Sequence, residues 1–318
     1  MPYIYYLLLL FTSLLWGGNF VVGKSLVDYA SPSTLTLLRW VIAVACLIPI
    51  VWWKEKSLVP CKKALIPLLL MGGTGVVLFN LFQFLALDYT TASNVGLIST
   101  FNMFSIALCS YLLLKEKIHV FQLVALLISF SGVLLVLTNG HLEVLFALRF
   151  NKGDLFMLAA VTLWGLYAVC SKWAMKYMSP LMATLYSGIF GILMLAPFHI
   201  GDFKIEKVDD TFVQSILYTG VISTVVCMLL WNIGVQKLGA TTSGIFLNFN
   251  PVFTAILAFF FLDERMTVVQ GFGSLIVIIG SVLFTMVKTN PFKLIKKKFE
   301  WNRTPVVDAT IPLAIKKE

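Results

Sequence analysis

The chain has 318 residues, of which 59% are apolar and 12% are charged, and its formal net charge is +9. Its mean hydropathy is +0.92. An average soluble domain carries about 25% charged residues, so this chain has too few charges to cover a surface that faces water. The composition therefore excludes a water-soluble domain and predicts an all-α membrane protein, because irregular backbone is not stable against lipid.

The apolar residues come in long runs that are separated by mostly short polar connections. About 20 consecutive apolar residues cross the hydrocarbon core of a bilayer as a helix. Taken in chain order, the runs predict ten transmembrane helices, at residues 4–24, 33–53, 64–87, 92–114, 119–138, 154–174, 181–200, 212–235, 241–262 and 267–287. A basic, polar tail follows Lys288.

The two halves of the chain are copies of each other at a constant offset of 148 residues. Matching pairs include Trp16 and Trp164, Lys24 and Lys172, Pro32 and Pro180, Asn102 and Asn250, Glu116 and Glu264, and Gly132 and Gly280. Each copy holds five predicted helices, an odd number, so the second copy enters the membrane from the opposite side. Such inverted-topology repeats are a common plan of secondary transporters.

This duplication predicts the domain organisation. The first repeat, helices one to five, is expected at residues 1–140, followed by a linker at 141–153. The second repeat, helices six to ten, is expected at 154–288, followed by a basic cytoplasmic tail at 289–318.

Lys and Arg residues are concentrated on one side of the predicted membrane. If the N-terminus is cytoplasmic, the connections and the near part of the tail on that side hold 15 of them, against 6 on the other side. Cytoplasmic loops carry such an excess, so both termini are predicted to be cytoplasmic. The net charge follows from this topology and gives no reason to expect a nucleic-acid partner. The run 296–298 of three lysines is expected to lie against anionic lipid headgroups.

Several local patterns resemble the EamA family of the drug/metabolite transporter superfamily over about residues 5–288. They are Leu15-Trp16-Gly17 with Asn19, Arg39 in the second helix, Lys115-Glu116-Lys117 and Asp263-Glu264-Arg265 at the ends of helices four and nine, and the following Gln122 or Gln270 and Gly132 or Gly280. The resemblance implies ten helices with both ends inside the cell. It also implies export or exchange of small metabolites, such as amino acids, through a cavity lined by helices three, four, eight and nine.

The ninth predicted helix contains a proline near its midpoint, at the expected depth of the membrane centre. Pro251 has no N–H and clashes with the carbonyl of Leu247, which predicts a break in the helix there. Asn248 and Asn250 lie in the same turn. Broken helices at the midplane build substrate sites in transporters. The alternative is a packing kink whose asparagines bond to neighbouring helices.

Other polar and aromatic residues are predicted at a similar depth. Asn102 is the repeat partner of Asn250, and Asn80 and Gln83 lie three residues apart on one face of helix three. A cavity lined by amides and aromatic rings would suit a zwitterion or a neutral polar solute. The further candidates for substrate binding are Trp231, Trp16, Trp164 and Tyr167. All of these could instead hold helices together or anchor them at the membrane interface.

Arg39 is the clearest charge inside a predicted span. Such groups are functional candidates because a charge within the membrane is energetically unfavourable. Two interpretations stay open. Arg39 could bind a carboxylate of the substrate, or it could serve the structure by pairing with a carbonyl or with the region of Asp88.

The residues that are missing also narrow the function. No Asp or Glu lies well inside a predicted span, which disfavours a proton-coupled cation exporter and favours exchange. The five cysteines and three histidines show no metal-ligand spacing, and no nucleophile is paired with a base at depth, so we expect no metal, no cofactor and no enzymatic activity. Residues 18–25 match a phosphate-binding loop pattern, but they end a membrane helix without the required strand.

The sequence therefore predicts a secondary transporter that moves a small polar metabolite, an amino acid or a derivative, across the membrane by alternating access in the export direction. The alternative is a non-transporting membrane receptor or scaffold built on the same duplicated bundle. The expected partners are a small-molecule substrate and membrane lipids, and the oligomeric state stays open. The lack of a transit-peptide pattern favours the bacterial cytoplasmic membrane.

Overall fold

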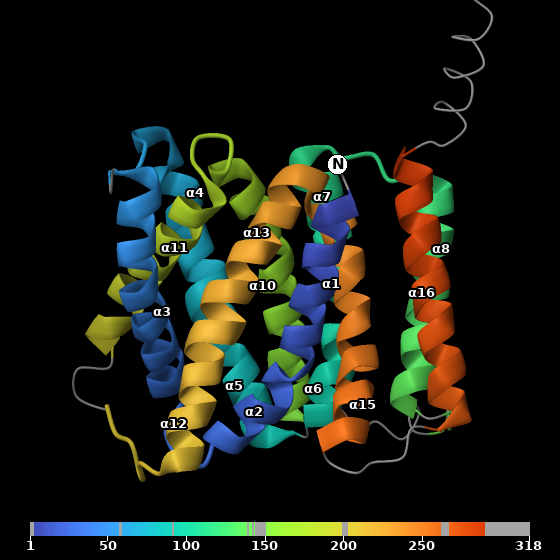
Figure 1. The fold of residues 1–318 in the computed structure, drawn as a ribbon, viewed down its shortest axis with the longest axis horizontal. Coiled ribbons are helices and arrows are strands. Elements are labelled where there is room, and N and C mark those ends of the chain that lie inside the picture. The colour runs from blue at the N-terminus through green and yellow to red at the C-terminus, as the bar shows by residue number, and fades with distance from the viewer. Residues whose placement is uncertain are drawn as a thin grey trace, which may run out of the picture.

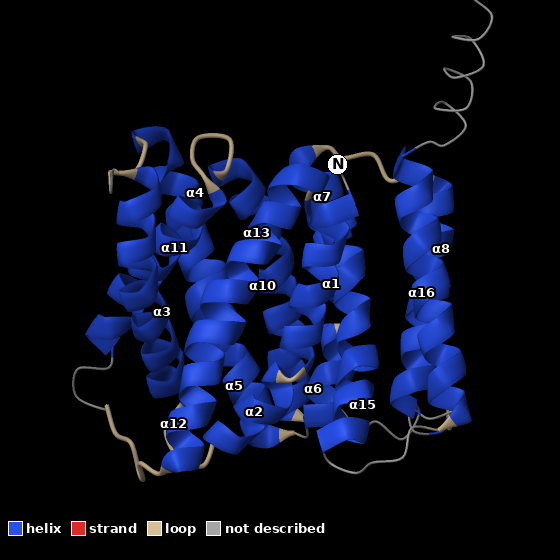
Figure 2. Cartoon of the chain, in the orientation of Figure 1, coloured by secondary structure: helices blue, strands red, loops and turns tan. Residues whose placement is uncertain are grey.

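The structure, a computed structural model, describes residues 3–56, 59–90, 92–138, 140, 141, 143, 151–198, 203–261 and 267–289. Helices make up almost all of this part of the chain, and its β structure is a single bridge between Ala30 and Ile205 (Figure 2). The predicted tail after residue 289 and most of the predicted linker lie outside the described residues. The all-α class is confirmed for the part described.

The elements follow in chain order. The first half contains α1 (Tyr3–Gly17), α2 (Asn19–Leu26), α3 (Pro32–Glu55), η1 (Lys62–Ala64), α4 (Leu65–Met71), η2 (Gly72–Leu78), α5 (Phe79–Tyr89), α6 (Ala92–Ser99), α7 (Asn102–Leu114) and α8 (Val120–Thr138). The second contains α10 (Lys152–Ala174), α11 (Pro180–Leu195), η3 (Ala196–Phe198), α12 (Asp210–Leu217), η4 (Tyr218–Val226), α13 (Cys227–Leu238), α14 (Ala240–Gly244), η5 (Ile245–Asn248), α15 (Phe249–Phe261) and α16 (Val268–Thr289).

Within the described residues, six helical stretches are long and apolar enough to cross a membrane. They are Tyr3–Leu26, Pro32–Glu55, Lys62–Tyr89, Lys152–Ala174, Asp210–Leu238 and Val268–Met286. Shorter apolar helices run beside them at Asn102–Leu114, Val120–Val136 and Pro180–Leu195. The helices stand side by side in one bundle (Figure 1). We call the end of the bundle that carries the N-terminus the N-terminal face, and the end that carries α12 the opposite face.

The starts of α3 and α11 show how the repeat dictates local structure. Each begins with a serine that caps the helix and a proline in the first turn, Ser31-Pro32 and Ser179-Pro180. The serine hydroxyls accept hydrogen bonds from the amides of Thr34 and Met182. A serine cap followed by a proline at the first helical position is a strong start signal, because proline lacks an N–H that the first turn does not need.

The last helices of the two halves, α8 and α16, pack against each other at one edge of the bundle (Figure 1). Their backbones approach closely because glycines face the partner helix, as Gly132 and Gly280 do. The hydroxyl of Ser129 lies 3.4 Å from the carbonyl oxygen of Val277, and these two residues are 148 positions apart. Equivalent positions of the two repeats therefore meet at this contact, as expected on a pseudo-two-fold axis.

Several helices depart from regular α geometry at equivalent depths. Wide π-helical turns occupy Gly72–Leu78 and Tyr218–Val226, which overlap at the repeat offset. A turn at residues 100–101 separates α6 from α7, and a 3-10 turn at Ile245–Asn248 lies between α14 and α15. The sequence predicts an irregularity only in the ninth helix. The continuous helix predicted at 92–114 is wrong, and the Ser99 hydroxyl, which donates to the Gly96 carbonyl, accompanies its break.

Candidate functional site

A cavity lies in the middle of the bundle, between elements of both halves of the chain. Its enclosed volume is about 40 Å³. Polar residues that line it are Asn19, Arg39, Asn80, Gln83, Asn102 and Asn250, and apolar and aromatic ones are Trp16, Phe20, Trp40, Gly75, Phe79, Trp164, Met228 and Leu247. Small-molecule sites have this composition, with mostly apolar walls and a few polar groups that fix orientation.

Among the described residues, Arg39 is the single charged one that lines this cavity, and it is buried. Its guanidinium donates hydrogen bonds to Thr224 Oγ1 at 2.5 Å, to Asn80 Oδ1 at 2.9 Å and to Ser223 Oγ at 2.9 Å. All three acceptors are neutral, and no carboxylate of the described residues forms an ion pair with it. Two of its five N–H groups therefore stay available, and its positive charge has no negative partner within the described chain.

The wide turns of η2 and η4 supply the groups that hold Arg39. In η2, the side chain of Asn80 bonds two backbone carbonyls, because its Nδ2 donates to Gly75 O at 2.8 Å and to Val76 O at 2.9 Å. In η4, Thr224 Oγ1 donates to Thr219 O at 2.7 Å. π-helical turns often occur at functional sites because they redirect side chains that a regular helix would place elsewhere.

Several polar atoms at this cavity have no hydrogen-bond partner among the residues that the structure describes. They are the indole Nε1 of Trp40 and of Trp164, Nε2 of Gln83, and Oδ1 of Asn102. A buried polar atom without a partner is unfavourable, so such atoms in one place indicate a site that a ligand or water completes. Together these atoms offer three nitrogen donors and one oxygen acceptor next to the guanidinium of Arg39.

An aromatic layer lies on the side of the cavity nearer to the N-terminal face. The rings of Trp16 and Trp164 meet edge to face with centroids 5.4 Å apart. Trp164 also packs on Tyr167 at 5.1 Å and on Trp231 at 5.6 Å. Tyr167 and Trp231 are fully buried, and the Tyr167 hydroxyl bonds Asn232. Along α10 and α13, Tyr167 and Trp231 follow the cavity residues Trp164 and Met228 toward the N-terminal face.

The structure brings most of the predicted site residues together. Those that line the cavity are Trp16, Arg39, Asn80, Gln83, Asn102, Trp164 and Asn250. Trp231 and Tyr167 lie behind them in the aromatic layer. Asn248 turns away and donates to Ser129 Oγ at 2.8 Å, so it joins η5 to α8. Pro251 is the third residue of α15, within the first turn that follows η5.

Other residues of the site have no counterpart among the predicted site residues. Asn19 lines the cavity and accepts a hydrogen bond from Ser223 Oγ at 2.7 Å. It lies three residues after Trp16, so helical spacing was a signal for it. Trp40 and Phe79 gave no signal, because a ring that faces lipid and a ring that faces a cavity are equally apolar.

The arrangement favours an anionic or zwitterionic ligand. No Asp or Glu lines the cavity among the described residues, and those residues contain no cluster of acidic, histidine and cysteine side chains that could hold a metal ion. A cation would meet Arg39 without a compensating carboxylate, whereas a carboxylate would meet a fixed charge and several donors.

The sequence matches the EamA-like transporter family twice, over residues 3–138 and over residues 151–286. The two matched ranges begin 148 residues apart, which is the spacing of the paired residues in the two halves.

Similar proteins cover nearly the whole chain. An uncharacterized transporter of Archaeoglobus fulgidus is 30% identical over 88% of this chain and 96% of its own length. The uncharacterized transporter YyaM of Bacillus subtilis is 29% identical over 86% and 91%. An S-adenosylmethionine/S-adenosylhomocysteine transporter of Chlamydia muridarum is 27% identical over 80% and 81%.

A solved crystal structure shows the same fold, with a TM-score of 0.71, 18% identity and coverage of 88% of this chain and 96% of the other. The family and the relatives are transporters and not enzymes, and the long apolar helices place this protein in a membrane that it crosses several times. With two matches that together span most of its length, the chain belongs to the EamA-like transporter family.

Proposed function

We propose that the protein is a secondary transporter that exports a small polar metabolite with a carboxylate, an amino acid or a derivative, by alternating access. The observation that carries this proposal is the central cavity, in which a buried guanidinium faces polar atoms of both halves. Among the described residues, the guanidinium has no carboxylate partner and these polar atoms have no hydrogen-bond partner. Alternating access then consists of rocking of the two repeats about this site.

The proposed topology has ten transmembrane passages, with both termini in the cytoplasm. It rests on the ten apolar runs and on the excess of Lys and Arg on one side of the membrane. The proposed repeats are residues 1–140 and 154–288, joined by the linker 141–153 and followed by the tail 289–318. In this orientation the N-terminal face is cytoplasmic, and Arg39 lies in the half of the membrane nearer to the outside.

Each polar group of the cavity has a proposed role. The carboxylate of the substrate accepts hydrogen bonds from Arg39, from Gln83 Nε2 and from an indole N–H. Asn102 Oδ1, an acceptor without a partner, receives the ammonium group, with Asn250 beside it. The apolar part of the substrate packs on Trp16, where rings supply contact area without a hydrogen-bond requirement.

Counterflow in proteoliposomes tests the function. Vesicles are loaded with a mixture of unlabelled amino acids and S-adenosylmethionine, the latter because the chlamydial relative is named for it. Saturable entry of one labelled compound supports the proposal. No entry of any of them, with the protein shown to be folded, would contradict transport of these substrates and favour a receptor or a scaffold on the same bundle.

The two asparagines of the ninth helix separate binding from packing. The main effect expected of Asn250→Ala is an about tenfold lower counterflow, because one hydrogen bond to a charged group contributes about 1.5–3 kcal/mol. Asn248→Ala is the matched control. It should lower the unfolding temperature instead, because it removes the bond to Ser129. Equal flux in Asn250→Ala and in the unmodified protein would exclude Asn250 as a ligand.

A further inference from the structure

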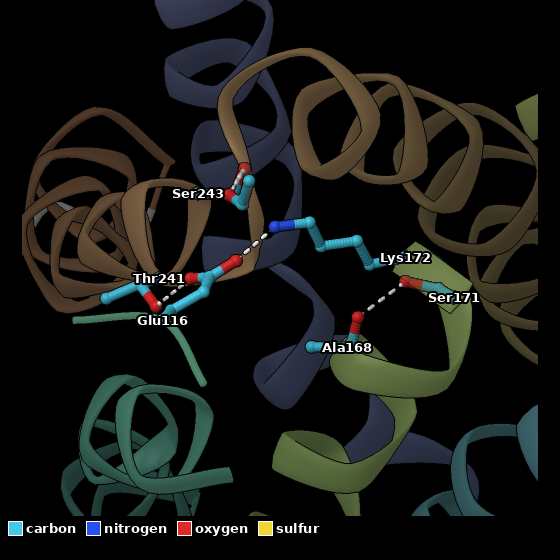
Figure 3. A network of polar contacts seen from close by, with 7 residues as sticks. Glu116, Ala168, Ser171, Lys172, Thr241 and Ser243 are labelled. Atoms are coloured by element: carbon cyan, nitrogen blue, oxygen red, sulfur yellow. Dashed lines mark hydrogen bonds and ion pairs between the residues drawn. The ribbon is translucent and has the colours of Figure 1, made fainter. Parts of the chain in front are cut away.

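A polar cluster at the N-terminal face joins the two repeats (Figure 3). The carboxylate of Glu116, which follows α7 in the first repeat, forms an ion pair with Lys172 near the end of α10. Its second oxygen accepts a hydrogen bond from Thr241 Oγ1 at 2.8 Å, at the start of α14. Lys172 and Thr241 both belong to the second repeat, so one carboxylate ties two helices of that repeat to the first.

The end of α7 aims Glu116 at these partners. Lys115 has a left-handed backbone with φ of 54°, and the amide of Glu116 donates to Ser110 O at 3.2 Å. This reversal at a helix C-terminus turns the chain back over the helix end. The side chain of Glu116 therefore lies across the ends of α10 and α14, as Figure 3 shows.

The three helices that meet in this cluster also line the cavity. Asn102 begins α7, Trp164 lies in α10, and Asn250 lies in α15, the continuation of α14. Along α10, Lys172 follows Trp164 by eight residues, a rise of about 12 Å. From the cavity toward the N-terminal face, the aromatic layer therefore comes first and the cluster second.

The equivalent lysine of the first repeat makes a different set of contacts. Lys24 lies 148 positions before Lys172, at the opposite face. Its ammonium donates to the carbonyl oxygens of Leu87 at 2.5 Å and Thr90 at 3.3 Å, both in its own repeat. The two repeats therefore bind the lysines at these equivalent positions with different partners. A carrier that is closed at one face requires such a difference between its repeats.

We propose that Glu116, Lys172 and Thr241 form a gate that closes the N-terminal face and opens in each transport cycle. This inference rests on the proposed function. Glu116 acts by position and does not contact the substrate in the cavity. Its two bonds to the second repeat hold α7 against α10 and α14, and their release allows these helices to separate.

Two native cysteines report on the gate in the full-length protein in membranes. Cys170 is buried in α10 between the cavity and Lys172, whereas Cys61 is exposed at the same face. We expect Glu116→Gln to raise the rate at which a polar maleimide modifies Cys170 about three- to fivefold, the factor expected for a partly exposed ion pair. Peptide mapping measures each cysteine separately, and Cys61 should react at an unchanged rate.

Matched variants control for charge and for fold. Lys172→Gln should reproduce the effect, and the exchange of charges in Glu116→Lys with Lys172→Glu should restore slow modification of Cys170. Lys24→Gln, which removes the equivalent lysine at the opposite face, should not raise the rate.

The labelling results test the gate independently of the proposed transport function. An unchanged rate at Cys170 in both single variants would overturn the gate. A parallel rise at Cys227, which is fully buried, would overturn it too, because it reports a loosened fold. The assay needs no substrate, so its result holds even if counterflow finds none.

Discussion

Replacing Arg39 by glutamine is expected to lower substrate counterflow by at least about a hundredfold. Glutamine can still donate hydrogen bonds through its amide, but the substitution removes the charge that the cavity presents to a carboxylate. Removal of one partner of a buried, hydrogen-bonded charge pair costs about 2–5 kcal/mol, and about 3 kcal/mol corresponds to this factor. The measurement is the initial rate of labelled substrate entry in proteoliposomes at a fixed protein density.

Two further variants separate the charge of Arg39 from its hydrogen bonds. Arg39→Lys retains the charge without the planar fork and should keep a small part of the flux. Thr224→Val removes one neutral acceptor of the guanidinium and should reduce flux only a few fold, since Asn80 and Ser223 still hold the group. Normal flux in folded Arg39→Gln would leave Arg39 with a structural role alone.

Gly280→Ala is expected to lower the free energy of unfolding by about 2 kcal/mol, within the usual range for overpacking. A Cβ at this position would lie 2.4 Å from the backbone nitrogen of Ser129 and 2.7 Å from its Cα. Backbone cannot turn aside as a long side chain can, so α8 and α16 must separate. The midpoint of thermal unfolding in detergent measures the effect.

The same helix provides the control. A Cβ at Gly271 would meet nothing within 4 Å. Gly271→Ala should leave stability unchanged or raise it by up to about 1 kcal/mol, because alanine favours a helix over glycine. If both variants unfold at the same temperature, close approach of α8 and α16 does not contribute to stability.

The repeat and the depth of the polar residues could be predicted because both are written as identical residues at a fixed offset. Trp16 and Trp164 occupy equivalent positions in two helices, and so do Asn102 and Asn250. All four residues line the cavity. The family was predicted from local motifs such as Leu15-Trp16-Gly17 and Lys115-Glu116-Lys117, and it is shown by the two matches.

The rotation of the helices could not be predicted in the same way. In water the apolar stripe of a helix tells which face is buried, but lipid is as apolar as a protein interior. Asn248 and Asn250 illustrate the limit. Two residues apart, they point about 200° apart around the axis, and only one faces the cavity. The sequence contains both asparagines but does not indicate which of them faces the cavity.

The wide turns were missed for a different reason. In η2 and η4, the side chains of Asn80 and Thr224 bond backbone carbonyls of the wide turns, and both also accept a hydrogen bond from Arg39 of another helix. Such a conformation depends on contacts between helices, whereas sequence patterns report on one helix at a time. Glu116 was noted in its family motif, but its partners became visible only with the ends of α10 and α14 in place.

The contacts between equivalent positions of the two repeats have the character of an isologous dimer interface, in which a surface meets its own copy. Trp16 touches Trp164, and Ser129 touches Val277, each pair 148 positions apart. In a dimer of two identical chains, one substitution at such a position would change both sides of the contact at once. Each residue would then have to pack against its own copy in the other chain. Within a single chain the sides can vary separately. Ser129 and Val277 are now different residues, whereas Trp16 and Trp164 are still identical.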